Sequence, residues 1–305
     1  MEYQEANHFV FFEQPDVETV PVAVAKKSNT ALIFSKFKKD LFSTFWVFIL
    51  ATIVAIALIG PHLFDYNPDK IDTSIQNVLP SAQHWFGTDK MGRDLFIRTC
   101  EGVQISLLIA LVSTFVSIVF GTIYGALMAY FGGTVDRVMM WIIQVLNSLP
   151  SLLITMLILT VMGNSMVTML FALTITSWSH AARQARGLVL HLESLDYVVA
   201  AKMLHTPIHR LILKHFVPNM MSILILDLGH SIPANIFAEA GLSFLGIGLQ
   251  PPNTSLGILI SEGQQQMLQQ PSQLYIPVAI LVLLVFSFNI IGDGLRDALD
   301  PKYAK

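Results

Sequence analysis

The chain has 305 residues, of which 53% are hydrophobic and only 13% are charged. Soluble domains carry about 25% charged residues, so this composition excludes an ordinary soluble domain and predicts a protein that crosses a membrane several times. The net charge of −3 says little about partners, because the position of each charge decides its effect in a membrane protein. The single cysteine, Cys100, excludes an internal disulfide framework and a cysteine-based zinc cluster.

Residues 1–40 are polar and end in a lysine-rich flank, which predicts a cytoplasmic tail. Their first half is acidic, so we do not expect a cleaved signal peptide, which has a basic start and an apolar core. Residues 41–64 hold no charge and are long enough for a first membrane-spanning helix, since one span takes about 20 residues. A polar segment at 65–101, predicted to be external, follows it.

The second span is predicted at 102–135. Residues 138–179 hold no charge over a length too great for one helix, and a turn at 162–165 is expected to divide them into the third and fourth spans. Pro150 predicts a kink in the third span, because proline removes a helical hydrogen bond.

The remaining spans complete a predicted six-helix membrane domain at 41–294. A loop at 182–215 precedes the fifth span at 216–245, an external segment at 246–274 precedes the sixth span at 275–291, and a C-terminal tail occupies 295–305.

Lysine and arginine positions indicate the orientation, because cytoplasmic loops are enriched in both. With a cytoplasmic N-terminus, 14 of the 18 lysine and arginine residues lie on the cytoplasmic side. The other four, Lys70, Lys90, Arg93 and Arg98, lie outside. Both termini and the loop at 182–215 are therefore predicted to be cytoplasmic.

The loop at 182–215 is basic and its pattern predicts two short helices. The first is expected to begin at a cap formed by Ser194 or Asp196 and to run to Leu204. Thr206 is expected to cap the second, with Pro207 at its first position, where the N–H that proline lacks has no partner. Such a loop fits docking on another protein, and an amphipathic loop lying on anionic lipid is the alternative.

Several motifs, in order along the chain, resemble those of one family. They are FGTDKMGRDLF at 86–96, YFGGTVDR at 130–137, LNSLPSLL at 146–153, VAA at 199–201 with FVPN at 216–219, AEAGLSFLGIGLQPP at 238–252 and FNIIGDGLRDALDP at 288–301. Over residues 40–302 the chain resembles binding-protein-dependent ABC importer permeases, and among them the second permease subunit of the oligopeptide/dipeptide branch. The resemblance implies an all-α, type I ABC importer permease fold.

The resemblance also implies that the loop couples the permease to ATPase subunits. The coupling residues would be Tyr197, Ala200, Ala201, Lys202, Met203, Leu204 and His205. The chain departs from the family pattern at Val199, where glutamate is usual, and at His205, where glycine is usual, so we expect Thr206 and Pro207 to make the turn. The sequence holds no G-x-x-x-x-G-K-[ST] phosphate loop, so no cofactor is expected on this chain, and ATP and Mg would bind the partner ATPase subunits.

Two further groups of residues are candidates for function, and no catalytic or metal-binding residue is expected. Asp89, Arg93 and Asp94 are candidates for external docking of a solute-binding protein, and a folded plug packed against neighbouring loops is the alternative. Asp227 and His230 are candidates for the translocation path, because charges at membrane depth usually face an interior or a wet cavity. A satisfied pair packed against a partner permease is the alternative.

The resemblance implies a peptide-importing permease subunit in the plasma membrane of a bacterium. Its partners would be a second homologous permease, which completes a heterodimeric pore, two ATPase subunits, an extracellular peptide-binding protein and the lipid bilayer, with no nucleic acid. Nickel chelates, glutathione or heme remain alternative cargoes. An intramembrane enzyme is a remote alternative, since no HExxH motif occurs and the adjacent His230 and Ser231 point apart on a helix. An autonomous secondary transporter would be expected to have more spans or an inverted repeat.

Overall fold

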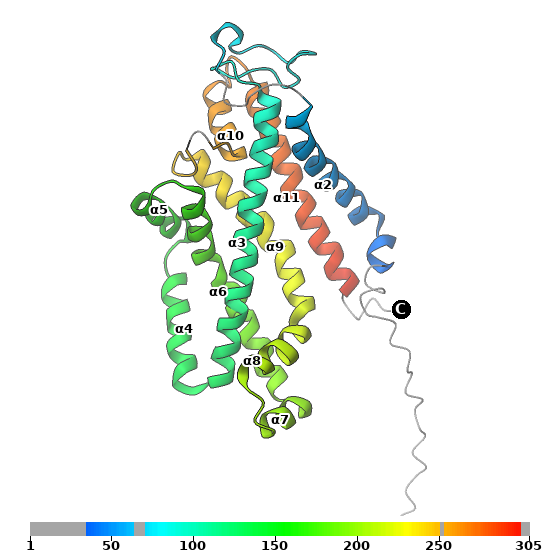
Figure 1. The fold of residues 1–305 in the computed structure, drawn as a ribbon, viewed down its shortest axis with the longest axis vertical. Helices are drawn as coiled ribbons and strands as arrows, with labels where there is room; N and C mark the ends of the chain where they lie inside the picture. The colour runs from blue at the N-terminus through cyan, green and yellow to red at the C-terminus, as the bar shows by residue number, and fades with distance from the viewer. Residues whose placement is uncertain (1–34, 64–70, 251–252, 300–305) are drawn as a thin grey trace, which may run out of the picture.

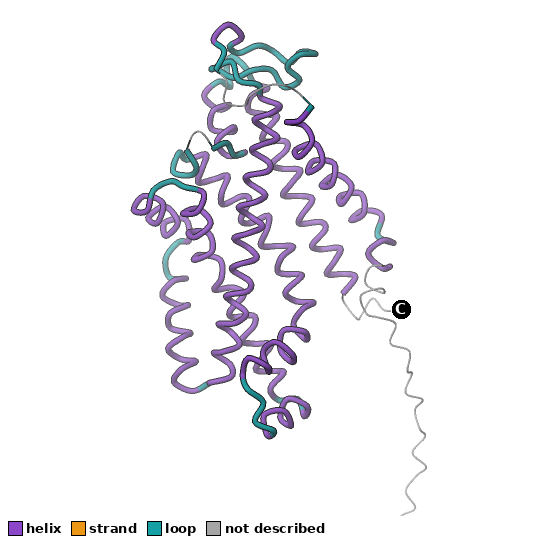
Figure 2. Tube along the Cα trace, in the orientation of Figure 1, coloured by secondary structure: helices purple, strands orange, loops and turns teal. Residues whose placement is uncertain are grey.

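Residues 35–63, 71–250 and 253–299 are described by the computed structural model. Within these ranges every regular element is a helix, apart from one isolated bridge between Thr88 and Asp94 (Figure 2). The all-α prediction is therefore confirmed. Most of the predicted N-terminal tail, 1–34, and the end of the predicted C-terminal tail, 300–305, lie outside the described residues.

Long helices packed side by side form the body of the molecule (Figure 1). They are α2 (Leu41–Ile59), α3 (Leu95–Phe131), α6 (Met166–Glu193), α9 (Val217–Phe244) and α11 (Ser272–Leu299). The shorter helices are α4 (Gly133–Asn147), α5 (Ser151–Met162), α7 (Asp196–Met203), α8 (Ile208–Leu211) and α10 (Leu256–Gln265), with 3-10 turns at Gly60–His62 and Thr73–Ile75 and a π-helical turn at Ile212–Phe216. Helices α7 and α8 lie at one end of the molecule, and α10 lies near the other (Figure 1).

Length and composition support four or five of the six predicted spans. Four helical stretches are long and apolar enough to cross a membrane: Leu41–His62, Leu95–Phe131, Ile208–Phe244 and Ser272–Leu299. The pair α4 and α5 adds a fifth if it forms one broken span. Helix α6 does not qualify, because His180, Arg183 and Arg186 make its second half polar.

Several helices extend beyond the predicted boundaries. Helix α3 begins at Leu95 rather than at residue 102, because the carboxylate of Asp94 accepts hydrogen bonds from the amides of Phe96 and Ile97. Helix α6 continues past residue 182 to Glu193, and α11 continues past residue 291 to Leu299. Charges show where a helix leaves the hydrocarbon, and the helix itself continues for as long as its backbone bonds are satisfied.

The third predicted span is broken, as Pro150 predicts. Helix α4 ends at Asn147, α5 begins at Ser151, and the two axes differ by 83°. The predicted turn into the fourth span is also confirmed. Gly163, with a φ of 87°, ends α5, and the Ser165 hydroxyl oxygen accepts from the amide of Thr168 to begin α6.

Helices α3 and α6 approach closely because two glycines face α6. A Cβ atom at Gly121 would lie within 2.5 Å of the carbonyl oxygen of Trp178. A Cβ atom at Gly125 would overlap the carbonyl oxygen of Ala182. Small residues at such contacts let two backbones pack in a membrane, where apolar burial alone gives no preference for protein over lipid.

Candidate functional site

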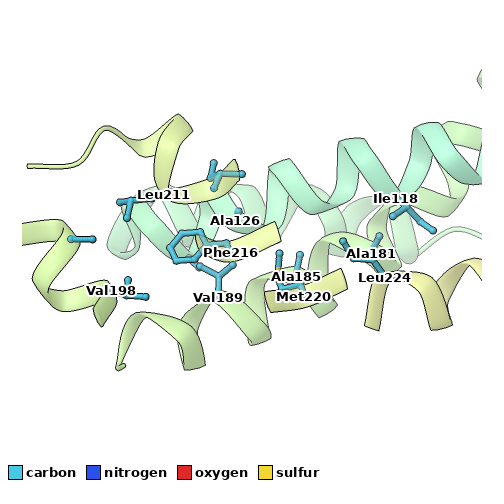
Figure 3. Close-up of a cluster of buried hydrophobic side chains, with 13 residues drawn as sticks. Ile118, Ala126, Ala181, Ala185, Val189, Val198, Leu211, Phe216, Met220 and Leu224 are labelled. Atoms are coloured by element: carbon cyan, nitrogen blue, oxygen red, sulfur yellow. The ribbon is translucent and has the colours of Figure 1, made fainter. Parts of the chain in front are cut away.

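Helix α7 is attached by one face to the end of α6, to α8 and to the π-helical turn that follows α8. Val198 is fully buried and Ala201 is 9% exposed, and their three-residue spacing places both on the inner side of α7. They belong to a buried cluster with Val189 of α6, Leu211 of α8 and Phe216 of the π-helical turn (Figure 3). Full burial of one valine contributes about 1.5–3 kcal/mol, so this buried cluster holds α7 firmly against the bundle.

The start of α7 differs from the prediction. Its N-cap residue is Leu195, whose side chain makes no capping hydrogen bond. The Ser194 hydroxyl instead donates to the carbonyl of His191 at 2.7 Å, at the end of α6. Asp196 is the first residue of α7, where its negative charge is favourable near the positive end of the helix dipole.

The end of α7 corrects the prediction for the turn. His205 itself adopts a left-handed conformation, with a φ of 54°, at the position where the family pattern has glycine. The amide of Thr206 bonds to the carbonyl of Ala201 at 3.1 Å, and that of His205 bonds to the carbonyl of Lys202 at 2.9 Å. This pair of bonds is a Schellman motif, which needs a left-handed residue where His205 lies, so Thr206 and Pro207 do not replace it.

The second predicted loop helix is not separate from the fifth span. Pro207 is the N-cap of α8 rather than its first residue, and α8 continues through the π-helical turn into α9. The amide of Val217 bonds to the carbonyl of Ile212, five residues back. This wider turn lies just before Pro218, which supplies no N–H and whose ring would clash with the carbonyl of Lys214 in a regular helix.

Polar contacts add to the attachment of α7. The Nζ atom of Lys202 lies 2.8 Å from Oε1 of Glu193 and 5.2 Å from the centre of the Tyr130 ring. The ring of Tyr197 lies 6.0 Å from that of His215. The side chain of Lys202 is therefore directed toward α6 and α3 rather than fully into solvent.

The outer side of α7 is exposed and apolar at its end. Met203 is 75% exposed and Leu204 is 82% exposed. Tyr197, Ala200 and His205 are exposed as well. The seven predicted coupling residues thus divide into an outer set of these five and an inner set of Ala201 and Lys202.

Asp227 and His230 line one cavity of about 320 Å³ between α6, α9 and α11. Oδ1 of Asp227, a residue 7% exposed, lies 3.6 Å from Nε2 of His180 and accepts from the Ser231 hydroxyl at 3.4 Å. Nε2 of His230 lies 3.5 Å from Oδ1 of Asp293. The two predicted path residues therefore share a polar cavity, and each has its own partner.

The three predicted docking residues are buried in the described part of the segment predicted to be external, which we call the external segment. Oδ2 of Asp89 lies 2.7 Å from Nε of Arg93 and 2.7 Å from Nη1 of Arg98. Both arginines also contact Glu262 of α10, at 3.3 and 2.6 Å. Asp94 caps α3 and lies 2.7 Å from Nδ1 of His84. These side chains fit the folded-plug alternative, because they are engaged in holding residues 71–94 against α3 and α10.

Sequence reasoning missed some of the residues that complete these sites. His180, Gln184 and Arg296 join Asp227 and His230 in their cavity, and Glu262 completes the ion network of the external segment. His180 comes directly after the charge-free run 138–179, and this position alone is only weak evidence that its side chain lines a polar cavity. The sequence gives no sign that it meets Asp227, because the two residues lie on different helices.

Comparison with known proteins shows the family to which the chain belongs. Residues 117–305 match the family described as "Binding-protein-dependent transport system inner membrane component". The dipeptide transport system permease protein DppC of Bacillus subtilis is 39% identical over 295 residues, which cover 96% of this chain and 92% of that protein. The oligopeptide transport system permease protein OppC of Haemophilus influenzae is 39% identical over 256 residues, covering 83% of this chain and 82% of that protein.

A solved structure shows the same fold at lower sequence identity. A chain of the inward-facing MetNI methionine ABC transporter aligns with 68% of this chain and 97% of its own length, with 18% identity and a TM-score of 0.54. This likeness supports the predicted type I ABC importer permease fold. The chain belongs to the family of inner membrane components of binding-protein-dependent transport systems.

Proposed function

We propose that this chain is one of two permease subunits of an ATP-driven importer of oligopeptides or dipeptides. The names of its relatives support the substrate class, because proteins 36–39% identical over most of the chain are named as dipeptide or oligopeptide transport permeases. The second permease, two ATPase subunits and an extracellular peptide-binding protein would complete the assembly. The chain itself would catalyse no reaction and bind no cofactor, with ATP and Mg held by the ATPase subunits.

The exposed end of α7 carries this proposal. Met203 and Leu204 present apolar side chains to solvent at the tip of a short helix whose other face is buried in the bundle. Two adjacent exposed apolar side chains on a helix fixed by its other face form a candidate contact surface for another protein. A groove on an ATPase subunit would receive this tip, and movement of that subunit would displace α7 together with α6 and α9, because the three are packed as one body.

The inner residues of α7 would act by positioning. Ala201 and Lys202 would hold α7 on α6, whereas Tyr197, Ala200, Met203, Leu204 and His205 would face the ATPase. Asp227 and His230 would line the translocation path within the polar cavity. The α7 end would lie in the cytoplasm and the external segment outside a bacterial plasma membrane, which the distribution of lysine and arginine supports.

Leu204→Glu tests the coupling role. The substitution places a charge on a side chain that is 82% exposed, so it should leave the fold intact and abolish co-purification with the ATPase subunits. Leu268→Glu is the matched control, since Leu268 is 96% exposed and follows α10 near the opposite end. Co-purification and peptide uptake unchanged by Leu204→Glu would refute the coupling assignment.

A further inference from the structure

The break between α4 and α5 releases backbone polar groups within a stretch apolar enough to span a membrane. Pro150 has no N–H, so the carbonyl of Leu146 lacks its helical donor four residues ahead. Released backbone at membrane depth is tolerated only where protein buries it or where it lines a water-filled cavity. A cavity of about 200 Å³ lies at this break and is lined by Leu146, Asn147, Ser151 and Thr176 among others.

A second cavity, of about 320 Å³, continues from the first between α5, α6 and α9. Ser151 and Thr176 line both cavities, and Thr155, Ser177 and Asn235 line the second. The described residues that line these two cavities include hydroxyl and amide groups and no charged side chain. We call this pair of cavities the neutral groove.

The neutral groove and the cavity of Asp227 and His230 are lined by residues of the same two helices, α6 and α9. On α6, His180 follows Thr176 by four residues, about one helical turn. On α9, Asn235 follows Ser231 by four residues, and Ser231 donates to Asp227. One turn of α6 and of α9 therefore carries the hydroxyl and amide groups of the neutral groove, and the neighbouring turn of each helix lies at the cavity with the ionisable groups.

The threonine hydroxyls in the neutral groove already use their hydrogens. The Thr155 hydroxyl donates to the carbonyl of Ser151 at 2.9 Å, and the Thr176 hydroxyl donates to the carbonyl of Ala172 at 3.1 Å. A hydroxyl oxygen that donates still has lone pairs that accept. A peptide main chain carries an N–H at nearly every residue, and each N–H buried without an acceptor costs about 1–3 kcal/mol.

We propose that the neutral groove binds the main chain of a peptide in transit through its hydroxyl and carbonyl oxygens. This inference rests on the proposed function. Because the groove carries no charge, its contribution to transport is the same for acidic, neutral and basic peptides. At about 320 Å³, its larger cavity lies at the lower end of the range of about 300–1,000 Å³ for small-molecule sites, which fits half of a site completed by the second permease.

Thiol labelling in the assembled transporter tests the location. Cys100 is the only cysteine and is buried, so Cys100→Ser gives a cysteine-free background. Ser151→Cys and Thr176→Cys should then react with a charged, water-soluble methanethiosulfonate reagent, and a transported tripeptide should slow the reaction several-fold. Leu268→Cys, after α10 at a residue 96% exposed, is the control whose reaction a peptide should leave unchanged.

Uptake measurements test the chemistry. Thr176→Val removes the hydroxyl and should lower uptake by the same factor for three tripeptides that differ only in a central Glu, Ala or Lys. Thr176→Ser restores the hydroxyl and should restore uptake, which separates hydrogen bonding from misfolding. A reduction that depends on peptide charge, or cysteines at 151 and 176 that peptide does not protect, would overturn the inference while leaving the proposed function standing. A parent transporter that takes up no peptide would instead refute the proposed function.

Discussion

Replacing Asp89 with asparagine should loosen the external segment while leaving the membrane helices folded. Asp89 is 2% exposed, and its Oδ2 atom lies 2.7 Å from guanidinium nitrogens of both Arg93 and Arg98. A charged hydrogen bond contributes about 1.5–3 kcal/mol, and breaking a buried ion pair costs about 3–5 kcal/mol. Glu262 still contacts Arg98 at 2.6 Å, so we expect the loss to lie at the lower end of this range. The free energy that holds the external segment folded should fall by about 3 kcal/mol.

Hydrogen–deuterium exchange measures this loss segment by segment. A loss of about 3 kcal/mol raises the opening equilibrium roughly a hundredfold, since each 1.36 kcal/mol is a factor of ten. Amides in residues 71–94 should exchange faster by that factor, and those of α7 should not change. Glu262→Gln is the control and should cost less, about 1.5–2 kcal/mol, because that side chain is 22% exposed whereas that of Asp89 is 3% exposed. Wild-type exchange in Asp89→Asn would refute the argument that this network holds the segment.

Three further predictions concern the helices. His205→Gly should slow amide exchange in the last turn of α7, because it removes a left-handed strain of about 1–2 kcal/mol at a cost in chain entropy of about 0.5–1 kcal/mol; faster exchange would contradict the Schellman assignment. Gly125→Ala should lower the yield of folded protein on size-exclusion chromatography, because its Cβ would overlap the carbonyl of Ala182. The same change at Gly187, which has nothing within 4 Å, should be tolerated. Asp227→Asn should change the preference among charged peptides in uptake assays, and an unchanged preference with intact assembly would contradict its place in the path.

The apolar pattern of the sequence predicts the helical class and the turns between most helices. Gly163 and Ser165 predict the turn between α5 and α6, and Pro150 predicts the break before α5, because each residue has a local backbone requirement. The pattern does not predict where α3 begins or where α6 ends. The sequence predicts Arg98 and Arg186 outside the helices because both are charged, but each pairs with a residue distant in sequence, Arg98 with Glu262 and Arg186 with Asp136, both at 2.6 Å.

The candidate sites were predicted less completely than the helices. The sequence predicts the short helix α7 and singles out Asp227 and His230, which share a cavity in the structure and whose role in a path stays a prediction. The sequence did not show that Ala201 turns inward, because only the tertiary packing against Phe216 and Val189 decides which side of α7 is buried. It also assigns the turn to Thr206 and Pro207, since a left-handed conformation is uncommon for residues other than glycine, and here the surrounding hydrogen bonds impose it on His205.

Helix α3 joins the two ends of the molecule without a break. Its 37 residues span about 55 Å at 1.5 Å per residue. The external segment is attached to its first turn through Arg98, and α6 is packed along it at Gly121 and Gly125. A tilt of about 5° at the α7 end would therefore move the opposite end by about 5 Å, so a small rotation of α3 at one end produces a displacement of atomic size at the other.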